Sequence, residues 1–165
     1  MPPHQVFYDG EEINFPSQVA AAFYGPSNPH TATNPLSKQL TDVTTRVQEL
    51  IAKGRSRFVG GLHTALKFDP CPGQPKILFV YFANQADLTV SDGETVKFPT
   101  SSIVKAYYSR EDDVNAGNVL DYKDVTDVVK KIVQSGRTIV EGGIHTTAVS
   151  DPFPNKKKLF LLFLA

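Results

Sequence analysis

The sequence predicts a mainly β protein of the α+β class, sandwich-like, with two tandem repeats related by pseudo-twofold symmetry. One observation is a long internal match: residues 41–83 and 123–165 align without a gap, 82 residues apart, and are identical at 15 of 43 positions. A period of this length indicates a duplicated structural unit. The other observation is that short apolar runs, bounded by turn-forming residues, dominate both copies, which is typical of strands. We expect about five strands and one short helix in each repeat.

The two repeats are expected to form one compact domain, with repeat one at residues 17–100 and repeat two at residues 101–165 completed by residues 1–16. A pattern of Asp-Gly-Glu followed by Phe-Pro ends copy one at residues 92–99 and also opens the chain at residues 9–16. No such pattern follows copy two. We therefore expect the N-terminal strand to close the second repeat by pairing with the last apolar run, because closure hides an edge strand.

Strands are expected before and after the helix of each copy. In copy one they are Gln18–Tyr24, Arg57–Leu62, Lys76–Phe82, Asp87–Val90 and Thr95–Phe98, and in copy two Ser102–Tyr108, Thr138–Ile144 and Lys158–Leu164. A turn of the form Asp-Pro-x-Pro, followed by Gly73 or Asn155, precedes the long apolar strand in each copy. Proline fixes its own torsion and the next residue type tolerates positive φ, so the turn is strongly indicated. Lys76 and Lys158 are expected to begin the long strands as solvated charges.

The short helix of each copy is predicted from apolar residues at i, i+4, i+7 and i+8, which lie on one helix face. These are Val43, Val47, Leu50 and Ile51 in copy one and Val125, Val129, Ile132 and Val133 in copy two. Asp42 and Asp124 are the N-cap candidates, ahead of the threonines two residues later. Gly54 and Gly136 are expected to end the helices, since glycine adopts the left-handed conformation without strain.

Charge and composition exclude several classes of function. The formal net charge is zero, with 17 basic and 17 acidic residues, which argues against a nucleic-acid partner. The single cysteine, Cys71, excludes an internal disulfide and a cysteine zinc cluster. The N-terminus has no apolar leader, and no apolar run approaches the roughly 20 residues of a membrane helix. We therefore expect a soluble cytoplasmic protein without cofactor or membrane partner; a homodimer is left open.

The valine pattern, the proline turn and the following lysine in each copy resemble a known family. The residues that carry the resemblance are Val43, Thr44, Val47, Asp69, Pro70, Cys71, Pro72, Gly73, Lys76, Leu78, Val80 and Tyr81 in copy one, and Val125, Thr126, Val129, Asp151, Pro152, Pro154 and Lys158 in copy two. They are similar to the domain of unknown function at the C-terminus of the mitochondrial J-domain protein of subfamily C, member eleven. Copy two departs from the pattern at Phe153 and Asn155. The resemblance implies a β-rich unit and a protein-interaction role, and it transfers no catalytic residue.

The candidate binding residues belong to a Gly-Gly-x-His-Thr motif that occurs once in each copy. Glycines near a strand end allow a ligand or another backbone to approach closely. An imidazole, a hydroxyl and an aspartate five residues on could hydrogen-bond a polyol, with a tyrosine ring as a stacking surface. The predicted ligand-binding residues are His63, Thr64, Asp69, His145, Thr146, Asp151, Tyr24 and Tyr107. The structural alternative is that the glycines form a bulge, the histidines satisfy buried backbone groups and the aspartates cap their turns.

No catalytic constellation is apparent, so we expect a non-enzymatic binding protein. The chain has no Gly-x-Ser-x-Gly elbow, and its four histidines do not show metal-ligand spacing. A duplicated unit gives two similar sites, and two weak sites gain by avidity. By analogy with small duplicated β proteins, the first expectation is a lectin-like protein that binds a glycan or small polar ligand. The alternative is an intracellular protein–protein interaction module that binds no glycan.

Overall fold

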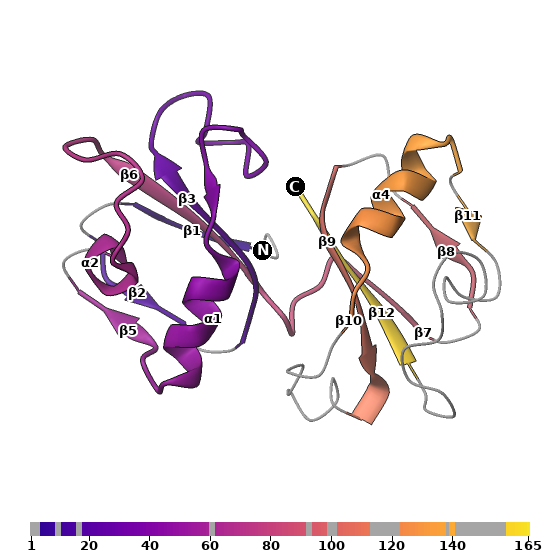
Figure 1. The fold of residues 1–165 in the computed structure, drawn as a ribbon. Coiled ribbons are helices and arrows are strands. Elements are labelled where there is room, and N and C mark those ends of the chain that lie inside the picture. Colours follow the sequence, from indigo (N-terminus) through magenta and orange to yellow (C-terminus); the bar gives the residue numbers. More distant parts are fainter. Residues whose placement is uncertain are drawn as a thin grey trace. The chain divides into compact units, whose positions relative to one another are not determined.

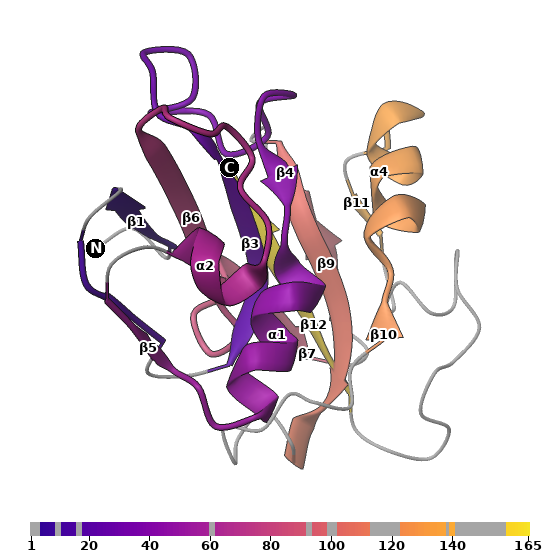
Figure 2. The same cartoon turned by 60° about the vertical axis from the view of Figure 1, so that its left-hand side comes forward.

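A computed structural model describes residues 4–8, 11–15, 18–59, 62–91, 94–98, 102–112, 123–137, 139–140 and 158–165. The chain divides into two compact units, Met1–Gln85 and Ala86–Ala165. Figures 1 and 2 show the ribbon from two directions. In both units strands dominate and the sheets are antiparallel, as the sequence predicts.

Unit one contains a four-stranded sheet in the order β1-β6-β3-β4 and a separate pair, β2–β5. Its described elements are β1 (His4–Tyr8), β2 (Ile13–Asn14), β3 (Val19–Pro26), β4 (Thr41–Asp42), α1 (Thr44–Ala52), β5 (Arg57–Phe58), α2 (Leu62–Leu66) and β6 (Lys76–Phe82). Figure 1 shows α1, α2 and the short strand pair on the same side of the large sheet. The core lies between these two layers, so the unit is a small sandwich of a sheet and a mixed layer.

Unit two contains a four-stranded sheet in the order β7-β12-β9-β10 and a separate pair, β8–β11. Its elements within the described residues are β7 (Leu88–Ser91), β8 (Val96–Lys97), β9 (Ile103–Arg110), β10 (Lys123–Asp124), α4 (Thr126–Gln134), β11 (Ile139–Val140) and β12 (Lys158–Leu164). The core of this unit gathers residues of the sheet, the helix and β8. The order of strands and helix therefore follows that of unit one.

The pairing register is the same in the two sheets. Phe23 faces Phe79 across β3–β6, and Tyr107 faces Leu161 across β9–β12. Each pairing also contains a bulge near the start of its first strand, where Ala20 in β3 is skipped in one unit and Val104 in β9 in the other.

The N-terminal strand does not close the second repeat, so that prediction is wrong. β1 pairs with β6 along its whole length, from His4 opposite Tyr81 to Tyr8 opposite Ile77. β12 pairs instead with β7 and β9. The hairpin pattern thus stands at the front of each unit, and the second occurrence belongs to unit two, not to the end of repeat one. The repeated pattern predicted where the strands lie in the sequence. Which strands pair with each other depends on long-range packing, which a local pattern does not contain.

The predicted helices are present and end as expected. Gly54 has φ +84° and Gly136 has φ +88°. In unit one the Gly54 N–H donates to the Ile51 carbonyl and the Arg55 N–H to the Leu50 carbonyl. These are the two bonds of a Schellman motif, which satisfies the last free carbonyls of the helix.

The N-cap prediction was off by one residue. Val43 and Val125 occupy the N-cap positions and carry no capping side chain. Asp42 and Asp124, one residue earlier, accept instead from the backbone N–H of the first helical residue, at 2.9 Å in each case. The aspartates thus satisfy a free donor of the helix from outside it.

The short pair β2–β5 carries an exposed ion pair. Arg57 Nε lies 2.5 Å from Glu12 Oε1. The hydrogen bond to Glu12, together with its charge, raises the pKa of the Arg57 guanidinium. Both groups are well exposed, so this pair adds little to the stability of the unit.

Candidate functional site

The described part of the Gly-Gly-x-His-Thr motif of copy one, residues 62–64, lies in a helix and not at a strand end. The expected strand Arg57–Leu62 is only two residues long, and His63 and Thr64 lie in α2. Leu62 and Leu66 are four residues apart and both are buried, so they fix α2 to the core by one face. Gly60 and Gly61, for which a bulge was considered, lie outside the described residues.

His63 has an unsatisfied polar atom. Its side chain is half-buried, and the Nδ1 atom is buried without a hydrogen-bond partner among the described residues. A buried polar atom without a partner costs free energy and calls for an explanation in a native structure. Thr64, next in sequence, is exposed.

The backbone after α2 adopts a rare conformation. Lys67 has φ +54°, the only positive φ at a non-glycine residue in the described part of the chain. The Phe68 N–H donates to the His63 carbonyl at 3.1 Å, which closes the turn around Lys67. Strained backbone of this kind occurs often at ligand sites, although it also occurs in structural turns.

Arg46 of α1 covers the segment that follows α2. Its guanidinium carbon lies 5.1 Å from the centre of the Phe68 ring, within cation–π range. Its Nη1 also lies 3.4 Å from the Leu66 carbonyl oxygen, to which it donates. An exposed cation therefore accompanies Thr64 and the half-buried His63 in this part of the unit.

Asp69 is engaged in structural contacts. Its Oδ1 accepts from the Cys71 N–H at 3.1 Å, as an aspartate does when it stabilises a turn. The same oxygen lies 3.5 Å from Lys76 Nζ, which also donates to the Gln74 carbonyl at 3.0 Å. The alternative role of Asp69, as the cap of its turn, agrees with these contacts.

Lys76 is not a solvated charge at the start of its strand, so that prediction is wrong. Its side chain is 5% exposed, and it spans the turn to reach Asp69. Lys158, at the same position of β12, is also buried, and the expectation of a solvated charge is wrong there too. Burying an ammonium group without a partner costs free energy. The carboxylate of Asp69 is the partner that offsets this cost for Lys76. Cys71 is buried within the same turn and forms no disulfide.

Tyr24 and Tyr107 offer no ring face to a ligand, because both are buried. Tyr24 belongs to the core of unit one. Tyr107 packs edge-on against Phe163, with ring centres 6.1 Å apart. The stacking role predicted for these two rings therefore has no support in the structure.

The candidate residues of copy two, His145, Thr146 and Asp151, lie outside the described residues. Their geometry is therefore not part of the site that the structure describes. In unit one the structure brings His63 and Thr64 together on α2, and it assigns Asp69 to the turn before β6.

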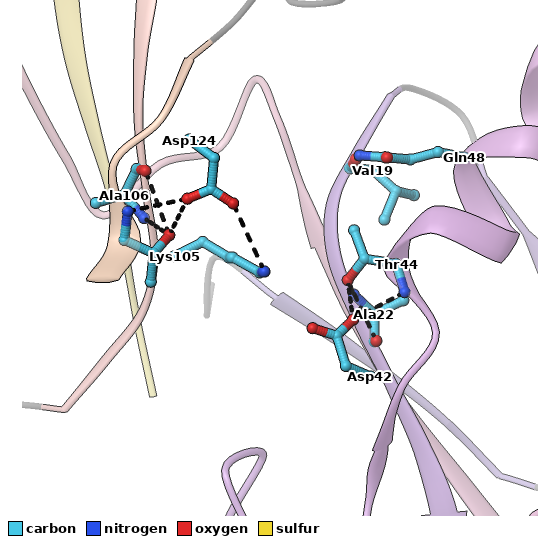
Figure 3. Close-up of polar contacts among 9 residues, drawn as sticks. Val19, Ala22, Asp42, Thr44, Gln48, Lys105, Ala106 and Asp124 are labelled. Carbon is cyan, nitrogen blue, oxygen red and sulfur yellow. Dashed lines mark hydrogen bonds and ion pairs between the residues drawn. The ribbon is translucent and has the colours of Figure 1, made fainter. Parts of the chain in front are cut away.

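A hydrogen-bonded triad that sequence reasoning missed joins the helix to the central strand in each unit (Figure 3). In unit one the Thr44 hydroxyl donates to Asp42 Oδ1 at 2.5 Å and accepts from the Ala22 N–H at 3.0 Å. In unit two Thr126 makes the same bonds, at 2.6 Å and 3.0 Å. The identical Asp-Val-Thr in both copies was the available signal, but it could be interpreted as a helix cap alone.

In unit two a basic side chain lies beside this triad. In unit two the ammonium of Lys105 lies 3.9 Å from Asp124 Oδ2. The threonines are buried in both units. Because each threonine hydroxyl both donates and accepts within its unit, the triad holds the helix to the strand.

No group of three or more histidine, cysteine or acidic side chains that could hold a metal occurs among the described residues. Within the same part of the chain, no helix is long and apolar enough to cross a membrane. No family model, no curated protein and no solved structure matches the chain. The resemblance to the C-terminal domain of the J-domain protein therefore stays a prediction.

Proposed function

We propose that this chain is a non-enzymatic, lectin-like binding protein made of two copies of one structural unit. The site in unit one centres on His63 and Thr64 of α2, and its ligand is a glycan or another small polyol. The observation that carries the proposal is the buried Nδ1 of His63, which has no hydrogen-bond partner among the residues that the structure describes. Because this atom is buried, the imidazole has to turn outward before a ligand hydroxyl can bind it; that bond would then recover the free energy that an unpaired polar atom costs.

Two neighbouring features support a polar ligand. The exposed hydroxyl of Thr64 can both donate and accept, as sugar hydroxyl groups require. Arg46, which lies over Phe68 and donates to the Leu66 carbonyl, carries further N–H donors from the neighbouring helix. Together they place hydrogen-bonding groups on α2 and beside the segment that follows it.

Asp69, Tyr24 and Tyr107 have structural parts in this proposal. Asp69 stabilises the turn and the buried Lys76, and the two tyrosines belong to the packed interior. The engagement of Asp69, and the burial of Cys71 in the same turn, also favour a binding role over catalysis.

His145 and Thr146 supply the second site of the proposal, on the strength of their identity with His63 and Thr64 of copy one. Two sites of one kind on one chain would raise the apparent affinity for a branched or multivalent glycan. A monovalent sugar would bind each site weakly.

The test is a glycan-array screen of the purified protein beside three variants. We expect His63→Ala to lose part of the signal and the double variant His63→Ala, His145→Ala to lose all of it. His30→Ala is the matched control, because His30 is exposed in a loop of unit one away from α2 in sequence. Binding that survives in the double variant would move the site elsewhere and refute the assignment to α2.

The second candidate is a protein–protein interaction module without glycan binding. The observation that favours it is Tyr8, which is 45% exposed on the edge strand β1. The predicted family resemblance points the same way. A blank array from a folded protein would favour this candidate over the lectin.

A further inference from the structure

Strand β1 leaves one edge of its sheet open. It is the first strand in the order β1-β6-β3-β4, and among the described residues it pairs with β6 alone. Its N–H and C=O groups on the other side can accept another strand. Gln5 and Tyr8 are exposed, so the edge is reachable within the part of unit one that the structure describes.

The residues of β1 lack the features that usually protect an edge strand. Natural edges carry lysine, other charges or proline, which oppose pairing with another chain. The segment His4–Tyr8 reads His-Gln-Val-Phe-Tyr and contains none of these. Both edge strands are flanked in the sequence by acidic residues, β1 by Asp9 and β7 by Asp87 and Asp92.

We infer that β1 pairs antiparallel with β1 of a second copy of this chain, around a two-fold axis at Val6. Such a pair places Val6 opposite Val6, Gln5 opposite Phe7 and His4 opposite Tyr8. No formal charge faces a like charge in this register. The two sheets would become one continuous sheet of eight strands, four from each copy.

A second copy satisfies the symmetry of this edge. An antiparallel pair related by a two-fold axis places one residue opposite its own equivalent, and in β1 the uncharged Val6 holds that position. Two-fold dimers are also the commonest closed assemblies of identical chains.

The inference goes beyond the proposed glycan site and does not depend on it. If both hold, a dimer would carry twice the number of sites, and avidity for a multivalent ligand would rise further. The pairing involves few residues, so we expect a weak dimer that forms as the protein concentration rises.

The test is sedimentation equilibrium of the full chain over a wide range of concentrations. We expect a dimer whose dissociation constant rises at least tenfold in Val6→Lys and in Val6→Glu, because each variant places like charges on the axis. An equimolar mixture of the two variants should restore the dimer, since lysine then faces glutamate. Thr89→Lys, at the matching position of β7, should leave the wild-type dimer unchanged.

A second variant keeps the test valid if the Val6 variants do not fold. Val6 is partly buried, so the double variant His4→Glu, Tyr8→Glu provides an independent break, with carboxylates facing across the axis. A wild-type protein that stays monomeric at every concentration would overturn the inference. A dimer that survives all of these changes, or a mixture that stays monomeric, would overturn it as well. Neither result depends on the glycan array, so the two proposals can fail separately.

Discussion

The two units share their hydrogen-bonded framework and differ in what surrounds it. Both have the same strand order, the same register and the same triad of aspartate, threonine and alanine. The segment between the central strand and the helix differs in sequence, residues 27–40 in unit one against residues 111–122 in unit two. In unit one, residues 27–40 form a tightly bonded loop in which the Thr31 hydroxyl donates to the Pro26 carbonyl at 2.7 Å. The framework thus depends on a few polar contacts, while the loops are free to differ.

The residue of the central strand that lies under this loop also differs between the units. Gly25 of β3 lies directly beneath Gln39 and Leu40. Ser109 holds the corresponding position of β9; it is fully buried, and its hydroxyl has no hydrogen-bond partner among the described residues. The loop of unit one therefore requires glycine, whereas unit two accommodates a side chain.

Exchanging the residue types at Gly25 and Ser109 should have the largest effect on the free energy of unfolding. In Gly25→Ser the new Cβ would lie 2.7 Å from the Gln39 carbonyl oxygen and 3.1 Å from Leu40 Cα, both backbone atoms. We expect a loss of about 3 kcal/mol, at the upper end for overpacking, measured by urea denaturation. The reciprocal Ser109→Gly should cost less than about 1 kcal/mol. Equal effects would contradict the close seating of the loop on Gly25.

The buried lysine of unit one provides the next largest effect. Asp69→Asn can keep the turn but leaves the Lys76 ammonium without its anion. Because Asp69 is 28% exposed, we expect a loss of about 2 kcal/mol, below the value for fully buried pairs. Lys76→Met should change stability by less than about 1 kcal/mol, and adding it to Asp69→Asn should recover most of the loss. Thermal denaturation of the three variants measures this, and failure of the double variant to recover would refute the ion pair's role.

The triad should matter equally in both units. Thr44→Val and Thr126→Val each leave a buried alanine N–H without its acceptor, and we expect each to cost about 1–2 kcal/mol. Hydrogen exchange is the direct measurement: the Ala22 amide should exchange faster in the first variant and the Ala106 amide in the second. An increase of about tenfold corresponds to 1.4 kcal/mol in the cost of local opening. Unequal effects would show that the Lys105–Asp124 ion pair changes the strength of the triad.

Substitution of the glycines that end α1 and α4 should have the smallest effect on the free energy of unfolding. Gly54→Ala and Gly136→Ala place a Cβ on a residue with positive φ, while nothing lies within 4 Å of the new atom in either case. The cost is therefore conformational, about 1 kcal/mol for each variant. Chemical denaturation should give the same value for both. A markedly larger loss at one position would mean that its turn makes contacts beyond the Schellman bonds.

Local patterns predicted the elements whose geometry is decided within a few residues. The helices α1 and α4 followed from their apolar spacing and from glycines that adopt positive φ. The turn before β6 followed from its prolines and from Gly73. The secondary structure around His63 was harder to predict, because a short apolar run fits a strand or a helix equally well. In the structure the segment is the helix α2, in which Leu62 and Leu66, four residues apart, lie buried on one face.

The sequence by itself determined where α1, α4, the long strands and the turn before β6 lie, because those depend on torsions and on hydrogen bonds between near neighbours. Only the tertiary structure decided that β1 pairs with β6, that Lys76 is buried beside Asp69, and that Tyr24 lies in the core. Each of these depends on residues far apart in the chain, whose contacts form only when apolar surfaces are buried together. The candidate site follows the same rule: His63 and Thr64 are neighbours in the sequence, and the fold buried Nδ1 of His63 without a partner in the part of the chain that the structure describes.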